Sequence, residues 1–141
     1  MILLDTNIVS ETMRDAPSPA VVAWFDGEQA LDLFIPSLVL AEIHFGIAKL
    51  APGARRGPLE RAVAELADEL YRGRIVNFDE RAASAYGAVS SRRRASGRPI
   101  SQMDALIASV TIANGAALAT RNTRDFAGLG ISLVNPFEHR P

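Results

Sequence analysis

The chain has 141 residues, of which 48% are hydrophobic and 22% are charged, and its formal net charge is −1. These values are typical of one globular domain that buries a core without covalent cross-links, and they do not indicate disorder. The absence of cysteine excludes disulfides, thiolate catalysis and cysteine-ligated zinc. The small net charge gives no general attraction toward a polyanion.

Predicted helices and strands alternate along the chain. Apolar residues at helical spacing, between capping residues and glycine or proline stops, predict helices at 8–13, 19–25, 38–50, 58–71, 80–94 and 105–113. Short apolar runs predict strands at 2–4, 31–36, 75–76, 116–119 and 131–134. This alternation favours an α/β domain with a mainly parallel sheet.

The sequence contains no pattern that directs a protein to or across a membrane. No apolar run approaches the roughly 20 residues that span a bilayer. The N-terminus lacks the basic region and the cleavage site of a signal peptide. We therefore expect a soluble, cytoplasmic protein with no membrane partner and a single domain over residues 1–141.

An acidic residue ends the first predicted strand. Residues 2–4 form an apolar run without polar alternation, which predicts a strand buried on both faces. Asp5 follows at once, and then Thr6 and Asn7, which suit a helix start. Open α/β sheets build their sites at the carboxyl ends of strands. Taken alone, however, this segment is better explained as a strand end and a helix cap than as a functional site, and we expect Asn7 only to begin the next helix.

The predicted helix at 38–50 is apolar on nearly every face, which predicts burial on all sides. Glu42 lies near its centre, where an unpaired carboxylate would be costly. Gly46, one turn later, lowers helix propensity by about 1 kcal/mol relative to alanine, which predicts close packing at that position.

Three consecutive arginines, Arg92, Arg93 and Arg94, end the predicted helix at 80–94. Basic residues in a last helical turn stabilise the helix dipole, which explains them structurally. Contact with the phosphates of a nucleic acid is an equally supported alternative.

Four acids occur in unusual surroundings. Asp5 ends a buried strand, Glu42 interrupts an apolar helix, Asp104 belongs to a capping-box pattern, and Asp125 follows a buried strand. Each has a structural explanation of its own. Together they supply the oxygen ligands that Mg²⁺ and Mn²⁺ require. Such an ion would offset the repulsion among the carboxylates and activate a water toward a phosphodiester. The residues suit neither a zinc site nor a nucleophilic triad.

Four segments, in this order along the chain, resemble the four motifs of PIN-domain ribonucleases, and more closely those of the VapC and FitB toxins of prokaryotic toxin–antitoxin pairs: 1–7, 41–46, 104–108 and 120–126. The resemblance covers essentially the whole chain. It implies a three-layer α/β/α sandwich with a short, mainly parallel sheet and the first strand near its middle. It also implies a Mg²⁺- or Mn²⁺-dependent endoribonuclease that holds its metal with Asp5, Glu42 and Asp104.

The same resemblance implies partners. Members of these toxin families usually form homodimers and are neutralised by a small antitoxin, often with a ribbon-helix-helix DNA-binding domain. The antitoxin's C-terminal segment covers the active site, and operator DNA is reached only through the antitoxin. RNA is the implied substrate, with Arg92 and Arg93 as candidate contacts. The arginines could equally bind acidic residues of an antitoxin.

The fourth motif departs from the family pattern, because many relatives have an acid where this chain has Asn122. Either Asp125 substitutes for that acid, or Asn122 binds the metal or its waters as a neutral ligand. One or two ions are compatible with the motifs. Thr6 and Thr120 are candidates for hydroxyls that orient a carboxylate or a water.

Two other functions are compatible with the sequence. The chain could be a PIN-like module that binds RNA or protein with little or no cleavage, although the three main acids are present. It could also be a metal-dependent DNA nuclease, because nothing in the sequence recognises a 2′-hydroxyl.

Overall fold

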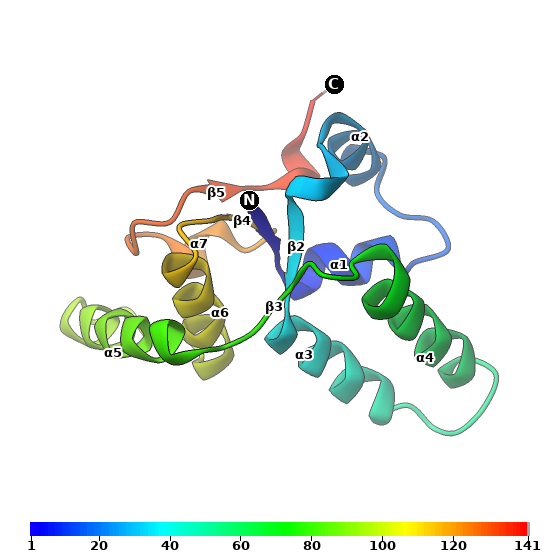
Figure 1. The fold of residues 1–141 in the computed structure, drawn as a ribbon, viewed down its shortest axis with the longest axis horizontal. Coiled ribbons are helices and arrows are strands. Elements are labelled where there is room, and N and C mark those ends of the chain that lie inside the picture. The colour runs from blue at the N-terminus through cyan, green and yellow to red at the C-terminus, as the bar shows by residue number, and fades with distance from the viewer. Residues whose placement is uncertain (141) are drawn as a thin grey trace.

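Five short parallel strands form one sheet in the order β3-β2-β1-β4-β5, with β1 in the middle (Figure 1). The structure is a computed structural model that describes residues 1–140. The strands are β1 (Ile2–Leu4), β2 (Leu33–Pro36), β3 (Ile75–Val76), β4 (Ala117–Ala119) and β5 (Leu133–Val134). The predicted α/β class, the parallel sheet and the central position of the first strand are confirmed.

Seven α-helices connect and cover the strands of the described chain, residues 1–140. They are α1 (Thr6–Thr12), α2 (Pro19–Gly27), α3 (Ser37–Ala48), α4 (Arg56–Glu65), α5 (Glu80–Ala95), α6 (Gln102–Ala113) and α7 (Thr123–Phe126). A π turn, Leu66–Leu70, extends α4. Every described helix is too short or too polar to cross a lipid bilayer.

The strand order reverses direction between β1 and β4. From β1 the chain steps to β2 and then to β3, with helices α1 to α4 in the connections. It then returns through α5 and α6 to β4, on the other side of β1. Figure 1 shows α5 with α6 at the lower left and α3 with α4 at the lower right, and α3 also contacts α6. Because ligands of open α/β sheets bind at the carboxyl ends of strands where the order reverses, the fold directs attention to the ends of β1 and β4.

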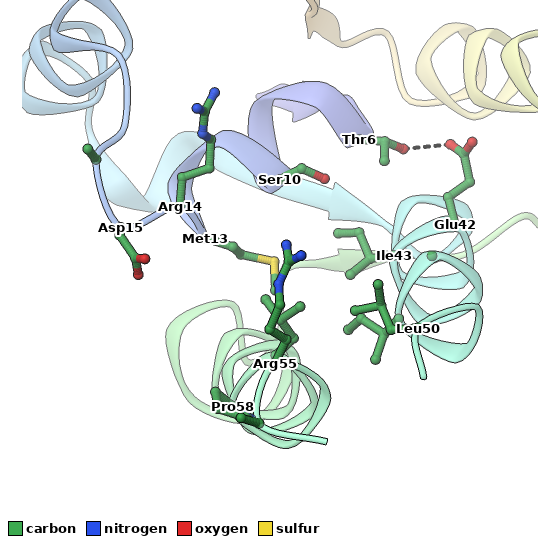
Figure 2. A pocket seen from close by; sticks show the side chains of 15 residues that line it. Thr6, Ser10, Met13, Arg14, Asp15, Glu42, Ile43, Leu50, Arg55 and Pro58 are labelled. Carbon is green, nitrogen blue, oxygen red and sulfur yellow. Dashed lines mark hydrogen bonds between the residues drawn. The ribbon is translucent and has the colours of Figure 1, made fainter. Parts of the chain in front are cut away.

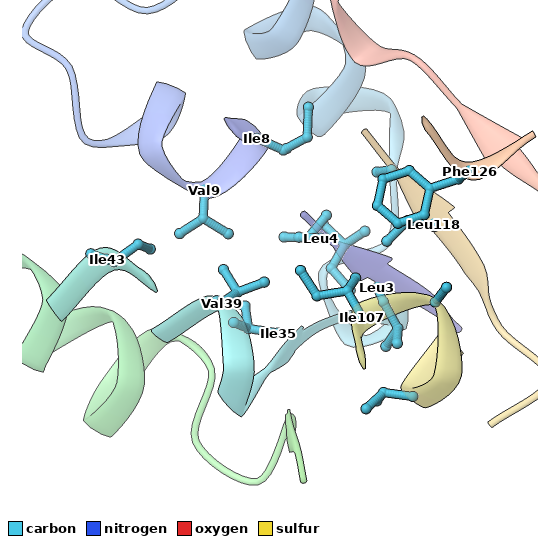
Figure 3. Packing of buried hydrophobic residues seen from close by; sticks show 14 of the residues in the cluster. Leu3, Leu4, Ile8, Val9, Ile35, Val39, Ile43, Ile107, Leu118 and Phe126 are labelled. Carbon is cyan, nitrogen blue, oxygen red and sulfur yellow. The ribbon is translucent and has the colours of Figure 1, made fainter. Parts of the chain in front are cut away.

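The core lies around β1, whose two neighbouring leucines point to opposite faces and are both buried. Leu3 and Leu4 are 0% and 1% exposed, which confirms a strand covered on both sides. Figure 3 shows them among Ile35 of β2, Leu118 of β4 and side chains of the covering helices. Burial of one such leucine side chain contributes about 1.5–3 kcal/mol to folding. The acidic end of β1 is therefore fixed by a packed strand.

Helix α3 differs from its prediction, because it is buried on one stripe only. Val39, Ile43 and Ile47 recur every fourth residue and face the core, whereas Phe45 is 65% exposed. Gly46 is also exposed, and a side chain there would meet no atom within 4 Å. The apolar composition of the helix does not specify which face packs. The expected burial on all sides and the expected close packing at Gly46 are therefore wrong.

Several element boundaries also shift for local reasons. Strand β2 begins at Leu33 because a 3₁₀ turn, Ala30–Asp32, precedes it. Strand β5 is reduced to Leu133–Val134. Helix α1 begins at Thr6, earlier than predicted, because Asp5 already caps it. Helix α4 begins two residues before Pro58, in a first turn where the missing N–H of proline is tolerated.

Candidate active site

Asp5 ends β1 and starts α1, so one residue joins both elements. Its backbone nitrogen donates to the carbonyl of Ala119 at 2.9 Å, which extends the pairing of β1 with β4. Its side-chain Oδ1 accepts from the backbone nitrogen of Thr6 at 2.8 Å and caps α1. The carboxylate is 5% exposed and is thereby fixed at the carboxyl edge of the sheet.

The second carboxylate oxygen of Asp5 is held from β4. Thr120, the buried residue after β4, donates its hydroxyl hydrogen to Asp5 Oδ2 at 2.6 Å. The same hydroxyl oxygen accepts from the backbone nitrogen of Asn122 at 3.0 Å. Thr120 therefore holds the Asp5 carboxylate from the strand at which the order reverses.

Asn7 has a larger role than the helix start predicted from the sequence. Its Nδ2 donates to Asp5 Oδ2 at 2.9 Å, and its Oδ1 accepts from the backbone nitrogen of Arg121 at 3.0 Å. The amide thus bridges α1 to the loop after β4. The sequence feature that could have predicted this contact is the position of Asn7 two residues after Asp5, because this spacing places both side chains on one turn.

Glu42 of α3 is connected to the site by a hydrogen bond from Thr6. The Thr6 hydroxyl donates to Glu42 Oε1 at 2.5 Å, a contact drawn in Figure 2. Glu42 is half-buried, and this contact explains how its carboxylate is satisfied on an otherwise apolar helix. The Thr6 hydroxyl therefore orients Glu42, while the Thr6 backbone orients Asp5.

Asp104 lies in the first turn of α6. Its backbone nitrogen donates to the hydroxyl of Ser101 at 3.1 Å, which confirms the predicted helix cap. Burial raises the pKa of Asp104, and the negative charges of Asp5 and Asp125 raise it further. The Ser101 hydrogen bond and the charge of Arg93 act in the opposite direction.

Electrostatic repulsion links the four acids in one chain of neighbours. Burial raises the pKa of Asp5, and the charge of Glu42 adds to this rise, against the hydrogen bonds from Thr120, Thr6 and Asn7. Asp104 is in turn repelled by Asp5 and Asp125. The predicted acids are therefore brought to one end of the molecule. The ionised forms of Asp5 and Asp104 are disfavoured there when no cation is bound.

Asp125 and Asn122 both lie at the short helix α7. Asn122 is its N-cap residue but makes no side-chain capping bond, and its backbone carbonyl accepts from the nitrogen of Asp125 at 3.0 Å. Both side chains are exposed. Of the two, Asp125 has a charge that influences Asp104.

The three arginines at the end of α5 separate into buried and exposed residues. Arg92 and Arg94 are exposed, whereas Arg93 is 5% exposed and donates through Nη2 to the backbone carbonyl of Asp125. Of the two arginines that the sequence suggests as phosphate contacts, Arg92 is therefore exposed and Arg93 is buried. All three lie in the last turn of α5, as the helix-dipole explanation requires.

The donor set of this site suits a hard divalent cation, because every candidate ligand is an oxygen. The side chains are not yet gathered around one point. Among residues 1–140, no three Asp, Glu, His or Cys side chains lie close enough together to hold an ion as they stand. The reason is visible in the contacts: Asp5 is occupied by three donors, and Glu42 is turned toward Thr6.

A groove of about 900 Å³ opens from the acidic site, between α1, α3 and the start of α4. Thr6 and Glu42 line it at the site, as Figure 2 shows. Arg14 and Arg55 add positive charge to its lining. Its apolar lining includes Met13, Ile43, Ile47, Leu50 and Leu59.

Comparison with known proteins identifies relatives over nearly the full chain. The sequence is 34% identical to the plasmid stability protein StbB of Pseudomonas syringae pv. tomato, over 98% of this chain and 99% of the relative. It is 33% identical to the VapC ribonuclease Y4jK of Sinorhizobium fredii, with the same coverage. It is 34% identical to the toxin FitB of Neisseria gonorrhoeae, over 97% of this chain and 99% of that toxin.

Solved structures agree with the sequence relatives. The structure of FitAB bound to an IR36 DNA fragment contains a chain that superimposes with a TM-score of 0.91 at 33% identity. That match covers 100% of this chain and 99% of the other. The sequence profile of the PIN domain matches residues 2–131. The chain therefore belongs to the PIN-domain family, as its four motifs indicated.

Proposed function

We propose that this chain is a metal-dependent endoribonuclease that acts as the toxin of a toxin–antitoxin pair. One observation carries the proposal: four acids from separate elements are electrostatic neighbours at the carboxyl edge of the sheet, where the strand order reverses. The relatives support the reaction type, because one is named a VapC ribonuclease and another a toxin. RNA would be hydrolysed in the cytoplasm, where such a substrate is found.

In this proposal Asp5, Glu42 and Asp104 hold Mg²⁺ or Mn²⁺. The support is their oxygen chemistry and the raised pKa of Asp5 and of Asp104, since a cation relieves the repulsion that helps to raise them. When bound, the ion supplies an activated water and stabilises charge on the phosphodiester. Glu42 is held by one described hydrogen bond, so we expect its side chain to reorient most readily toward an ion.

The other residues of the site position these acids. Thr120 and Asn7 fix the Asp5 carboxylate, and Ser101 caps the helix that presents Asp104. We assign the fourth position to Asp125, because its negative charge helps to raise the pKa of Asp104. Asn122 instead donates its backbone N–H to the hydroxyl of Thr120. Asp125 would bind an ion directly or through water.

We further propose that a cognate antitoxin, with a ribbon-helix-helix DNA-binding domain, inhibits the chain and that the chain forms a homodimer. Solved relatives include FitAB bound to an IR36 DNA fragment and FitAcB of Neisseria gonorrhoeae, and the relative FitB is named a toxin. The groove next to Thr6 and Glu42 is suited to an inhibitory antitoxin segment, because it combines an apolar lining with the charged side chains of Arg55, Asp15 and the Glu11-paired Arg14. Operator DNA would contact the antitoxin.

The test compares labelled RNA and DNA oligonucleotides of the same sequence, each with Mg²⁺, Mn²⁺ or EDTA. We expect cleavage of RNA with either metal and none in EDTA. Asp5→Asn should abolish cleavage and growth inhibition while circular dichroism reports an intact fold. Asp26→Asn, at an exposed acid of α2, is the matched control and should cleave normally.

Four results would contradict parts of the proposal. RNA cleavage that persists in EDTA would remove the metal requirement. Cleavage of DNA alone would favour a DNA nuclease. A folded Asp5→Asn variant that cuts RNA at the wild-type rate would exclude Asp5 as a catalytic residue. Binding of RNA without cleavage under any metal condition would favour a binding module.

A further inference from the structure

Arg121 is an exposed cation at the edge of the acidic site. It directly follows Thr120, whose hydroxyl donates to the Asp5 carboxylate. The backbone nitrogen of Arg121 donates to Oδ1 of Asn7 at 3.0 Å, and Asn7 donates in turn to Asp5. The Arg121 backbone is therefore fixed by the same two residues that hold the Asp5 carboxylate.

The side chain of Arg121 is held by an aromatic ring. Its guanidinium lies over the ring of Phe137, with 4.7 Å between the guanidinium carbon and the ring centroid. Phe137 belongs to the 3₁₀ turn Pro136–Glu138, which follows β5. Strands β4 and β5 are paired up to their last residues. The segments that carry Arg121 and Phe137 therefore leave the sheet side by side at its carboxyl edge.

This arrangement leaves the hydrogen-bonding edges of the guanidinium available. Stacking uses the face of the group, whereas its five N–H bonds point outward in its plane. Within residues 1–140, the hydrogen bond of Arg121 comes from its backbone, and the two salt bridges, Arg14–Glu11 and Arg56–Glu60, do not include it. A stacked guanidinium with free edges suits an external anion that accepts from a planar fork, such as a phosphate.

The position of the guanidinium determines which phosphate it can reach. Because it is stacked on Phe137, it lies on the β5 side of the acidic site. The groove lined by Thr6 and Glu42 lies on the other side, next to α3, which follows β2. The ends of β1 and β4 lie between these two sides. An RNA strand that crosses the acids from the groove therefore reaches Arg121 with a phosphate that flanks the scissile one.

We propose that Arg121 binds a phosphate of single-stranded RNA beside the cleavage site, and that Phe137 positions Arg121 for this contact. The inference rests on the proposed function for its substrate and deepens it by naming a substrate-binding residue. Its physical basis is charge, because clustered acids repel a polyanion and a cation held at their rim offsets that repulsion. A phosphate contact adds affinity and register without selecting a base sequence.

The first experiment measures binding of a fluorescein-labelled single-stranded RNA by anisotropy, in EDTA and at several KCl concentrations. Arg121→Met should weaken binding roughly tenfold at low salt. It should also reduce the slope of log K against log[salt] by about 0.7, the contribution of one phosphate contact with a single strand. Arg121→Lys keeps a cation and should retain the slope, with a smaller loss of affinity.

Arg72→Met is the matched control for this measurement. Arg72 is exposed and precedes β3, so it lies at the amino edge of the parallel sheet, opposite the acidic site. Its removal takes away the same charge and should change neither the affinity nor the slope. Arg121→Gln replaces Arg121→Met if circular dichroism shows that the methionine variant does not fold.

Two results would overturn the phosphate contact. If Arg121→Met binds RNA with wild-type affinity and slope, Arg121 only joins the last turn to β4. Such a structural role would lower the free energy of unfolding in urea and leave RNA binding unchanged. A lower affinity with an unchanged slope would also overturn the inference, because the lost contact would not be with a phosphate.

The second experiment asks whether Phe137 acts through Arg121. Phe137→Leu keeps an apolar side chain but removes the ring face that the guanidinium contacts. It should weaken RNA binding roughly threefold in the wild-type background and have little effect in the Arg121→Met background, where the group that it positions is absent. Phe137→Tyr keeps the ring and should bind RNA as the wild type does. Equal losses for Phe137→Leu in both backgrounds would overturn the positioning role.

The outcomes distinguish this inference from the proposed function. RNA that is bound through Arg121 but is not cut with Mg²⁺ or Mn²⁺ would contradict the nuclease and leave the phosphate contact standing. RNA cleavage by the wild type, together with unchanged RNA binding by Arg121→Met, would overturn this inference alone. A wild-type protein that binds no RNA at low salt would overturn this inference, and the cleavage assay would still decide the proposed function.

Discussion

The Thr120 hydroxyl donates a 2.6 Å hydrogen bond to Asp5 Oδ2 and so joins two residues that are 115 positions apart in the chain. Each residue directly follows a central strand, and the last residues of those strands, Leu4 and Ala119, are paired in register. The bond therefore spans the point where the strand order reverses. The position of the Asp5 carboxylate depends on this pairing as much as on its own strand.

Removing the Thr120 hydroxyl should destabilise the protein and leave the Asp5 carboxylate less firmly positioned. Thr120→Val keeps the shape of the side chain but leaves Asp5 Oδ2 and the nitrogen of Asn122 each without one partner. We expect the free energy of unfolding to fall by about 1–3 kcal/mol and RNA cleavage to fall at least roughly tenfold. Urea unfolding and initial cleavage rates measure the two effects. Thr120→Ser should retain most of both, and a Thr120→Val enzyme with wild-type activity would contradict the role.

Asn7 should matter more for cleavage than for stability. Asn7→Ala removes the donor to Asp5 and the acceptor for the nitrogen of Arg121. We expect a cleavage rate roughly 10- to 100-fold lower, because outer partners of metal ligands contribute in this range. Asn114→Ala, which removes a hydrogen bond at the end of α6, is the matched control. It should lower the unfolding free energy to a similar extent without changing the cleavage rate; equal effects of both variants on cleavage would argue against Asn7.

The features that sequence could predict are those governed by neighbours in the chain. The apolar run before Asp5 specifies a strand buried on both faces. The capping pattern that begins at Ser101 specifies that Asp104 lies in the first turn of its helix. Family resemblance added the grouping of Asp5, Glu42 and Asp104, which no local pattern contains. These predictions depend on residues within a few positions of one another or on motif order.

The features that sequence missed depend on contacts between distant elements. In the sequence, the apolar residues of α3 occur on nearly all of its faces. Only packing against the rest of the fold therefore decides that Phe45 is exposed. Arg93 looks like its neighbours in the sequence, but it is buried and donates to the backbone carbonyl of Asp125, 32 residues away. Asn7 acquires its second contact from a loop more than a hundred residues away. In each case the deciding partner lies outside the local window.

The fourth metal position can be assigned by comparing Asp125 with Asn122. If Asp125 holds the ion or its water, Asp125→Asn should weaken Mn²⁺ binding and cleavage by roughly tenfold, because one charge next to Asp104 is lost. The fold should persist, since Arg93 contacts the Asp125 backbone and not its carboxylate. Asn122→Ala should have a small effect in both assays. The reverse ranking in calorimetry would assign the position to Asn122.

The raised pKa of Asp5 predicts how stability without metal depends on pH. The folded protein keeps the Asp5 proton to higher pH than the unfolded chain, whose carboxyl has the usual value of 3.8. Between these two pKa values the folded state binds more protons, so the Asp5 contribution to stability falls as pH rises and then stays constant.

In EDTA, the unfolding free energy of Asp5→Asn minus that of the wild type should therefore increase from about pH 4 to about pH 7. The hydrogen bonds altered by the substitution add an offset that does not depend on pH. Saturating Mn²⁺ should remove the increase by stabilising the wild type at neutral pH. Urea titrations at several pH values measure the difference, and a difference that is flat or decreases with pH would show that Asp5 ionises as readily in the folded protein as in the unfolded chain.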